Sequence, residues 1–153
     1  MGVVFKALDD LMAWVEDGTA PVEGTQYTLD SLNQLVLPST AARRKGYQPV
    51  VSLLANGQHD KLEVGAGREV LFEARAEDPD NQLVKAEIDF EGDDRFDRSM
   101  DLSGRTAVAR FSFRYDKPGI YSPTVRVTDS TVSKGSQVGG IQNLARIQVI
   151  VSR

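Results

Sequence analysis

The sequence feature that most constrains the fold is a two-residue alternation of apolar and polar side chains, which begins near Gln48 and recurs to the end of the chain. Successive side chains of a β-strand point to opposite faces, so such runs predict strands with one buried and one exposed face. In the run over residues 69–77 the alternate residues are apolar, and we expect this set to face a core: Val70, Phe72, Ala74 and Ala76.

Further runs repeat this period. In residues 84–90 we expect Val84, Ala86, Ile88 and Phe90 to face the core, and Lys85, Glu87 and Asp89 to face water. The core positions expected from the later runs are Ala109, Phe111, Phe113, Tyr115, Val125 and Val127, and residues 145–149 close the sheet. Six or seven short strands over roughly a hundred residues fit one immunoglobulin-like sandwich. The predicted fold is therefore mainly β, an antiparallel β-sandwich over residues 48–153.

The first 47 residues follow a different pattern. Apolar residues at spacings of one, three and four predict a short amphipathic helix over residues 1–18, which ends at Gly18. Residues 19–47 are expected to be a linker with two short strand-like pieces, and residues 39–46 are too polar and basic for a core. The expected apolar face of the helix consists of Val4, Phe5, Leu8, Leu11, Met12 and Val15.

Composition and charge exclude several classes of function. The chain has no cysteine, which excludes disulfides, thiol nucleophiles and zinc–thiolate sites. Its net charge of −4 argues against a nucleic-acid partner, which would require clustered lysine and arginine. The apolar run over residues 50–55 is too short to cross a membrane. No signal peptide is recognisable at the N-terminus, so a signal for export would lie outside this chain.

The residues also argue against catalysis. The sequence contains no G-x-S-x-G, P-loop or H-E-x-x-H motif. The single histidine, His59, lies in a predicted turn over residues 56–60. A catalytic triad requires a nucleophile and an acid that converge on a firmly held imidazole, so we expect His59 to be solvated. We therefore expect no catalytic residues, no organic cofactor and no enzymatic activity.

Acidic residues around the end of the run at 84–90 form the one candidate metal site. Closely spaced carboxylates with a glycine that permits a sharp turn are typical of calcium loops. The spacing departs from the twelve-residue calcium loop and no bidentate glutamate closes it, so a solvated acidic turn remains the alternative. The candidate calcium ligands are Asp89, Glu91, Asp93, Asp94 and Asp97.

A second acidic group, Glu77, Asp78 and Asp80, precedes the same strand. At about 3.3 Å per residue, the two groups are expected to lie roughly 25 Å apart. The paired carboxylates of a glycosidase must lie within about 10 Å of each other, so the two groups are not expected to form one such site. Sugar binding by stacking would need exposed rings, and the aromatic residues expected outside the sandwich are Trp14, Tyr27 and Tyr47.

One segment carries a family resemblance. Residues 115–121, Tyr-Asp-Lys-Pro-Gly-Ile-Tyr, continue to the valine-rich run at 125–129, and this pattern resembles the signature of PKD domains. Residues 76–80 and 87–93 are similar to the DPD loop and the aspartate-rich strand end of that family. The resemblance implies a PKD-like sandwich over about residues 48–152. A tyrosine after the Pro-Gly turn can bond the turn backbone, and Pro123 is expected to cause a bulge or an edge because it lacks an amide donor.

The helix carries a second resemblance. Residues 11–21, Leu-Met-Ala-Trp-Val-Glu-Asp-Gly-Thr-Ala-Pro, are similar to the C-terminal helix and turn of α/β-hydrolases of the tannase and feruloyl esterase type. In that family the catalytic serine, acid and histidine precede this helix. The resemblance therefore implies that the helix is the tail of a neighbouring hydrolase domain.

These observations lead to one main hypothesis and one alternative. The main hypothesis is a C-terminal accessory module of an exported α/β-hydrolase-like protein, located outside the cell or in the periplasm, that acts as a spacer, stabiliser or interaction domain. The alternative is an independent calcium- or carbohydrate-binding module. The expected partner is an adjoining hydrolase domain or a second copy bound through the helix. We favour self-association, because the helix has a continuous apolar face that must be covered.

Overall fold

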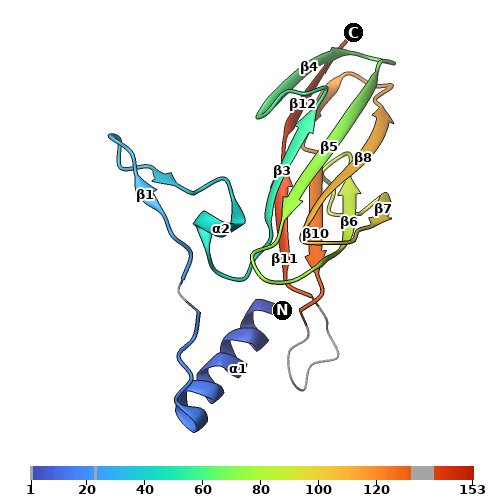
Figure 1. Cartoon of the computed structure of the whole chain (residues 1–153). Helices are drawn as coiled ribbons and strands as arrows, with labels where there is room; N and C mark the ends of the chain where they lie inside the picture. The colour runs from blue at the N-terminus through green and yellow to red at the C-terminus, as the bar shows by residue number, and fades with distance from the viewer. Residues whose placement is uncertain (1, 23, 132–139) are drawn as a thin grey trace.

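The computed structural model describes residues 2–22, 24–131 and 140–153, and Figure 1 shows the arrangement of its elements. The N-terminal part contains α1 (Gly2–Asp17), β1 (Thr28–Leu29), β2 (Leu35–Val36) and α2 (Ala41–Arg44). The strands that follow are β3 (Val50–Ala55), β4 (Lys61–Gly65), β5 (Glu69–Glu77), β6 (Leu83–Asp89), β7 (Arg98–Asp101), β8 (Thr106–Arg114), β9 (Gly119–Tyr121), β10 (Thr124–Asp129), β11 (Gln142–Arg146) and β12 (Gln148–Ser152). Neither described helix is long and apolar enough to span a lipid bilayer.

The strands from β3 onward form a two-layered sandwich. One layer is the antiparallel sheet β3-β5-β8, and the other contains the antiparallel sheet β11-β10-β6-β7. A third set, β4-β12-β9, continues the second layer, with β4 parallel to β12. The fold is a mainly β, immunoglobulin-like sandwich, as the two-residue alternation predicts.

Proline divides one long strand into β9 and β10. Strand β9 ends at Tyr121, and β10 begins at Thr124, directly after Pro123. The neighbouring strand is divided opposite this point into β11 and β12, and the Ile147 amide there donates to the Pro123 carbonyl at 3.1 Å. Proline offers no amide hydrogen to a sheet, so the ladder is interrupted where it occurs. The predicted irregularity at Pro123 is confirmed.

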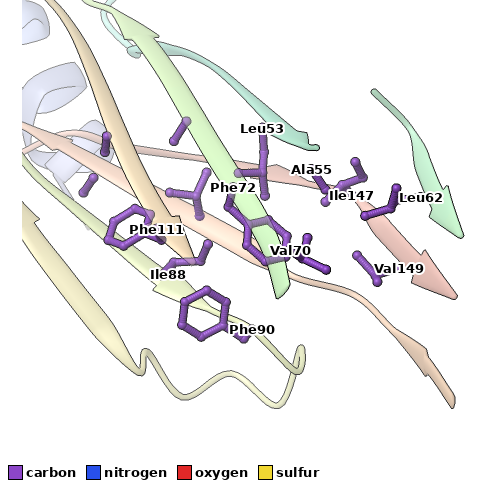
Figure 2. Close-up of a cluster of buried hydrophobic side chains, with 14 of the residues drawn as sticks. Leu53, Ala55, Leu62, Val70, Phe72, Ile88, Phe90, Phe111, Ile147 and Val149 are labelled. Atoms are coloured by element: carbon purple, nitrogen blue, oxygen red, sulfur yellow. The ribbon is translucent and has the colours of Figure 1, made fainter. Parts of the chain in front are cut away.

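The core lies between the inner faces of the two layers, as Figure 2 shows for its central side chains. Phe72 from β5 and Phe90, which follows β6, lie with their ring centroids 5.6 Å apart. Ile147 and Val149 extend the same cluster toward the far end of the sandwich. Burial of each such side chain stabilises the fold by roughly 1.5 to 3 kcal/mol.

The predicted inward residues of β5 and β10 are all buried, as are Ala109, Phe111 and Tyr115 of the third run. In β6 the prediction is wrong at two positions: Val84 is exposed and Asp89 is buried. Val84 is an extra residue at a β-bulge, because Lys85 pairs with Thr128 and Leu83 with Asp129, and Leu83 therefore turns inward in its place. Asp89 is buried because it bonds the backbone of the loop that follows.

The N-terminal part stands beside one end of the sandwich (Figure 1). Helix α1 covers the predicted range, and β1 and β2 pair within the two predicted strand-like pieces. Residues 41–44 form α2, and Ala41 is only 1% exposed. Its amide donates to a Glu77 carboxyl oxygen at 3.1 Å, which anchors α2 to the end of β5. The polar composition of residues 39–46 did not predict this buried contact.

Two tyrosines fasten the Pro-Gly turn to the sandwich. The buried Tyr115 hydroxyl donates to the Phe90 carbonyl at 2.8 Å, and the Tyr121 hydroxyl donates to the Lys117 carbonyl within the turn at 2.9 Å. The two rings lie 4.4 Å apart between centroids. Burial raises the pKa of Tyr115, so the hydroxyl stays protonated and remains a donor. The expectation that a tyrosine bonds the turn backbone is confirmed.

We expect Tyr115→Phe to reduce the free energy of unfolding by about 1 to 3 kcal/mol, because the buried Phe90 carbonyl loses its donor. The matched control, Tyr121→Phe, removes a more exposed hydrogen bond and should cost less than about 1 kcal/mol. Urea denaturation of both variants measures the difference. An equal loss of unfolding free energy in the two variants would contradict the conclusion that the buried Tyr115 hydrogen bond is the more stabilising one.

Candidate functional site

The loop after β6 contains the predicted calcium ligands and is organised around the Asp89 carboxylate. Asp89 is 1% exposed, and one of its oxygens accepts the amides of Glu91 and Gly92 at 3.0 and 2.7 Å. Its other oxygen accepts the Asp94 amide at 2.8 Å. Both oxygens of this carboxylate therefore hold the backbone of the loop that follows it.

Asp97 closes the same loop from its far end. Its carboxylate accepts the Phe90 amide at 2.9 Å, and its own amide donates to the Ile88 carbonyl at 2.8 Å. Gly92 has a φ of +82° and lies against the Ser122 backbone, where a β-carbon would collide. The loop is thus pressed onto the interruption between β9 and β10, and this position requires glycine.

The remaining predicted ligands do not share a common contact. The Asp93 carboxylate accepts the Arg95 amide at 3.0 Å, while Glu91 and Asp94 are exposed. Across residues 2–22, 24–131 and 140–153, no three acidic or histidine side chains gather closely enough to hold a metal ion. The five acidic residues lie at and after the end of β6, and the buried carboxylate among them, that of Asp89, binds backbone amides. Because both Asp89 oxygens already bind backbone amides, this geometry favours the alternative of a solvated acidic turn, and calcium titration decides between the two.

A surface cavity of about 610 Å³ lies beside this loop over the outer face of β10 and β11. Arg126 crosses it with a guanidinium carbon 4.0 Å from the centroid of the Phe96 ring, and it forms an ion pair with Glu87 at 2.8 Å. Arg146 also lines the cavity and donates to the Thr124 hydroxyl at 2.9 Å. The lining combines two arginines, two aspartates, several amides, two aliphatic side chains and one aromatic ring, and this mainly polar set suits a polar ligand.

The second acidic group lies at the other end of β6, as predicted, and it includes residues that the sequence analysis did not single out. Asp78 accepts the amides of Asp80 and Asn81 at 3.0 and 2.5 Å. The Asn81 side chain donates to the Thr131 hydroxyl, which in turn donates to the Asp129 carboxylate at 2.6 Å. This chain of bonds joins the loop before β6 to the end of β10. In the sequence, Asp129 at the end of the valine-rich run was the signal that could have indicated this connection.

One oxygen of Asp78 has no hydrogen-bond partner among the described residues, although the side chain is 2% exposed. Burial raises the pKa of Asp78, and the negative charge of nearby Asp129 adds to the shift, while the two backbone bonds oppose it. A buried oxygen without a partner is costly when it is charged, so folding makes the Asp78 carboxyl bind its proton more tightly.

The other singled-out residues lie at the surface. His59 is exposed in the turn between β3 and β4, as expected for a solvated turn residue. Trp14 and Tyr27 are exposed outside the sandwich, whereas the Tyr47 hydroxyl bonds Asp10 of α1. The two exposed rings therefore belong to the N-terminal part. The aromatic ring in the cavity lining is that of Phe96, which lies in the loop between β6 and β7.

No known protein family matches the sequence, and no curated protein matches it. Among solved structures, the chain is similar to the CARDB domain of a Pyrococcus furiosus protein crystallised with di-metal ions, at 16% identity over 67% of this chain and 91% of that chain, with a TM-score of 0.49. It is also similar to the PKD domain of an M14-like peptidase from a Thermoplasmatales archaeon, at 12% identity over 71% of this chain and all of that chain, again with a TM-score of 0.49.

We expect millimolar calcium to leave the melting temperature unchanged, because the Asp89 oxygens already bind three backbone amides. Binding to the folded state alone would raise the melting temperature. Thermal denaturation with calcium and with a chelator measures the effect. A rise that Asp93→Ala abolishes would establish the calcium site instead.

The pH dependence of stability should reveal the Asp78 carboxyl. A raised pKa in the folded state means that Asp78 favours folding at low pH, and that this contribution is lost as the pH rises from about 4 through the raised pKa. We therefore expect Asp78→Asn to become more stable relative to the wild type as the pH increases from 4 to about 7. Urea denaturation across this range tests it, and a difference that does not vary with pH would contradict it.

Proposed function

We propose that the chain is a non-catalytic accessory module of a larger, exported α/β-hydrolase-like protein, in which it acts as a spacer, stabiliser or interaction domain. The observation that carries the proposal is the use of the buried carboxylates. Asp89 and Asp129 each bond backbone amides of their own loops, so these acidic groups maintain turns. A sandwich in which these buried carboxylates bind the backbone of its own loops is suited to a structural role.

The N-terminal part supports the connection to a larger protein. Helix α1 includes the segment that resembles the C-terminal helix of tannase-type hydrolases, and the following residues lead through α2 into the sandwich. The resemblance of residues 115–129 to PKD domains supports a location outside the cell or in the periplasm. A serine nucleophile motif in the same reading frame upstream of residue 1 would establish the parent enzyme.

A binding module is the second candidate function. The cavity beside the loop after β6 holds Arg126 stacked on Phe96, and its volume of about 610 Å³ lies within the usual range for ligand sites. A polar carbohydrate is the class of ligand that this lining favours. Calorimetric titration with neutral and acidic oligosaccharides, compared between the wild type and Arg146→Ala, distinguishes this candidate from the accessory role.

The accessory role predicts that the purified chain hydrolyses neither nitrophenyl esters nor nitrophenyl glycosides above the buffer rate. The reason is that His59, the single imidazole, is exposed in a turn and lies outside any catalytic arrangement among the described residues. The His59→Ala variant is the control. Turnover by the wild type that this substitution abolishes would overturn the non-catalytic assignment.

A further inference from the structure

Exposed apolar side chains are concentrated at one end of the chain. Of the 20 large hydrophobic side chains exposed among the described residues, 14 lie in residues 3–37. The sandwich contributes only six among the described residues, and each of these lies in a different strand. Scattered exposed residues are ordinary, whereas a contiguous apolar patch marks an interaction surface. The N-terminal part therefore carries the surface that requires an explanation.

Seven of these residues form one face of α1, which we name the α1 apolar face: Val3, Val4, Leu8, Leu11, Met12, Trp14 and Val15. At about 100° per residue they cover roughly half of the helix circumference. Every residue within this half is uncharged. Each of the seven side chains is at least 42% exposed, so the sandwich does not cover this face.

The opposite face of α1 makes the contacts that hold the helix against the rest of the chain. Gly2 is buried against the Gly140 backbone, where a β-carbon would collide with the carbonyl oxygen. Asp10 accepts hydrogen bonds from Lys6 and from the Tyr47 hydroxyl. Burial opposes the shift, but these two bonds lower the pKa of Asp10, so the carboxylate is ionised at neutral pH. Because the polar face is held in this way, the α1 apolar face points away from the sandwich.

The area of the α1 apolar face matches what a stable dimer needs. If each side chain offers roughly 100 Å² of apolar surface, seven of them offer roughly 700 Å². Standard stable interfaces bury about 800 Å² on each partner. The α1 apolar face therefore supplies most of the apolar surface that an interface of ordinary size buries.

The charges of α1 favour an antiparallel pair. Glu16 and Asp17 lie at the C-terminal end of α1, and its last turn contains no basic residue. Acidic groups are unfavourable at the negative end of a helix dipole and favourable at the positive end. An antiparallel neighbour brings its own N-terminal turn beside these two carboxylates. The uncharged face between the ends can be buried without burying a charge.

We propose that the α1 apolar face binds the same face of a second copy of this chain, as an antiparallel helix pair related by a two-fold axis. This inference goes beyond the accessory role and does not depend on it. The hairpin β1–β2 is also apolar and exposed, but its strands have two residues each, so it offers no comparable continuous face. The hairpin therefore serves as the matched control.

Sedimentation equilibrium of the full chain at micromolar concentrations tests the proposal. We expect the mass of a dimer for the wild type, and a dissociation constant raised roughly a hundredfold or more for Leu8→Glu and Leu11→Glu, because each would place two unpaired charges in the interface. Glutamate is a good helix former, so these variants should keep α1 helical, which circular dichroism checks. The control Leu32→Glu, in the hairpin turn, should remain a dimer.

Crosslinking gives a second, independent measurement. The chain has no cysteine, so one introduced cysteine can only pair with its copy in another molecule. A two-fold axis near the middle of the face brings the copies of Leu8 or of Leu11 together, within the short range that a disulfide spans. Mild oxidation should therefore crosslink Leu8→Cys or Leu11→Cys, but not Leu32→Cys.

Three results would overturn the proposal: a monomeric wild type, a dimer that survives Leu8→Glu and Leu11→Glu, or crosslinking confined to Leu32→Cys. A monomer would assign the α1 apolar face to an adjoining folded domain instead. That result leaves the non-catalytic role intact, because the activity assay decides that role separately.

Discussion

The structure depends on the packing of two β-sheet faces through a continuous set of aromatic rings. Phe90 stacks on Phe113 with centroids 4.4 Å apart, and Phe113 meets Tyr115 edge-on at 4.8 Å. Phe72 lies in β5, Phe90 follows β6, and Phe113 and Tyr115 lie at the end of β8, so the set joins strands that are distant in sequence. Such pairs add to the stabilisation from burial alone. The Tyr115 hydroxyl then ties this cluster to the backbone where β6 ends.

Buried carboxylates hold the loops at the two ends of the sandwich. Asp89 secures the loop after β6, while Asp78 and Asp129 secure the opposite end of the sandwich. A carboxylate that accepts backbone amides replaces the hydrogen bonds that a tight loop would otherwise leave unmade. Residues whose composition indicates a metal site can therefore serve the fold. The exception is one Asp78 oxygen, which has no partner among the described residues, and burial raises the pKa of this carboxyl.

The N-terminal part has a different physical character. Its helix is held through polar contacts, and its apolar surface faces outward. Burial of apolar surface is the main source of stability in folded proteins, so such a face needs a partner to contribute. The sandwich buries its own apolar side chains, whereas seven large apolar side chains of α1 are exposed. This contrast is the physical reason for the proposal that α1 binds a second copy of the chain.

The sequence alone determined the sandwich, because alternation of apolar and polar residues reports which face of a strand is buried. The core residues of β5 and β10, the irregularity at Pro123 and the span of α1 all followed from local patterns. The inward turn of Leu83, the burial of Asp89 and the anchoring of Ala41 were decided only by the tertiary structure. A bulge, a loop cap and a docked helix each depend on partners distant in sequence, and neither composition nor periodicity contains that information. The same reason explains why the direction of the α1 apolar face was open until Gly140 and Tyr47 were placed beside the helix.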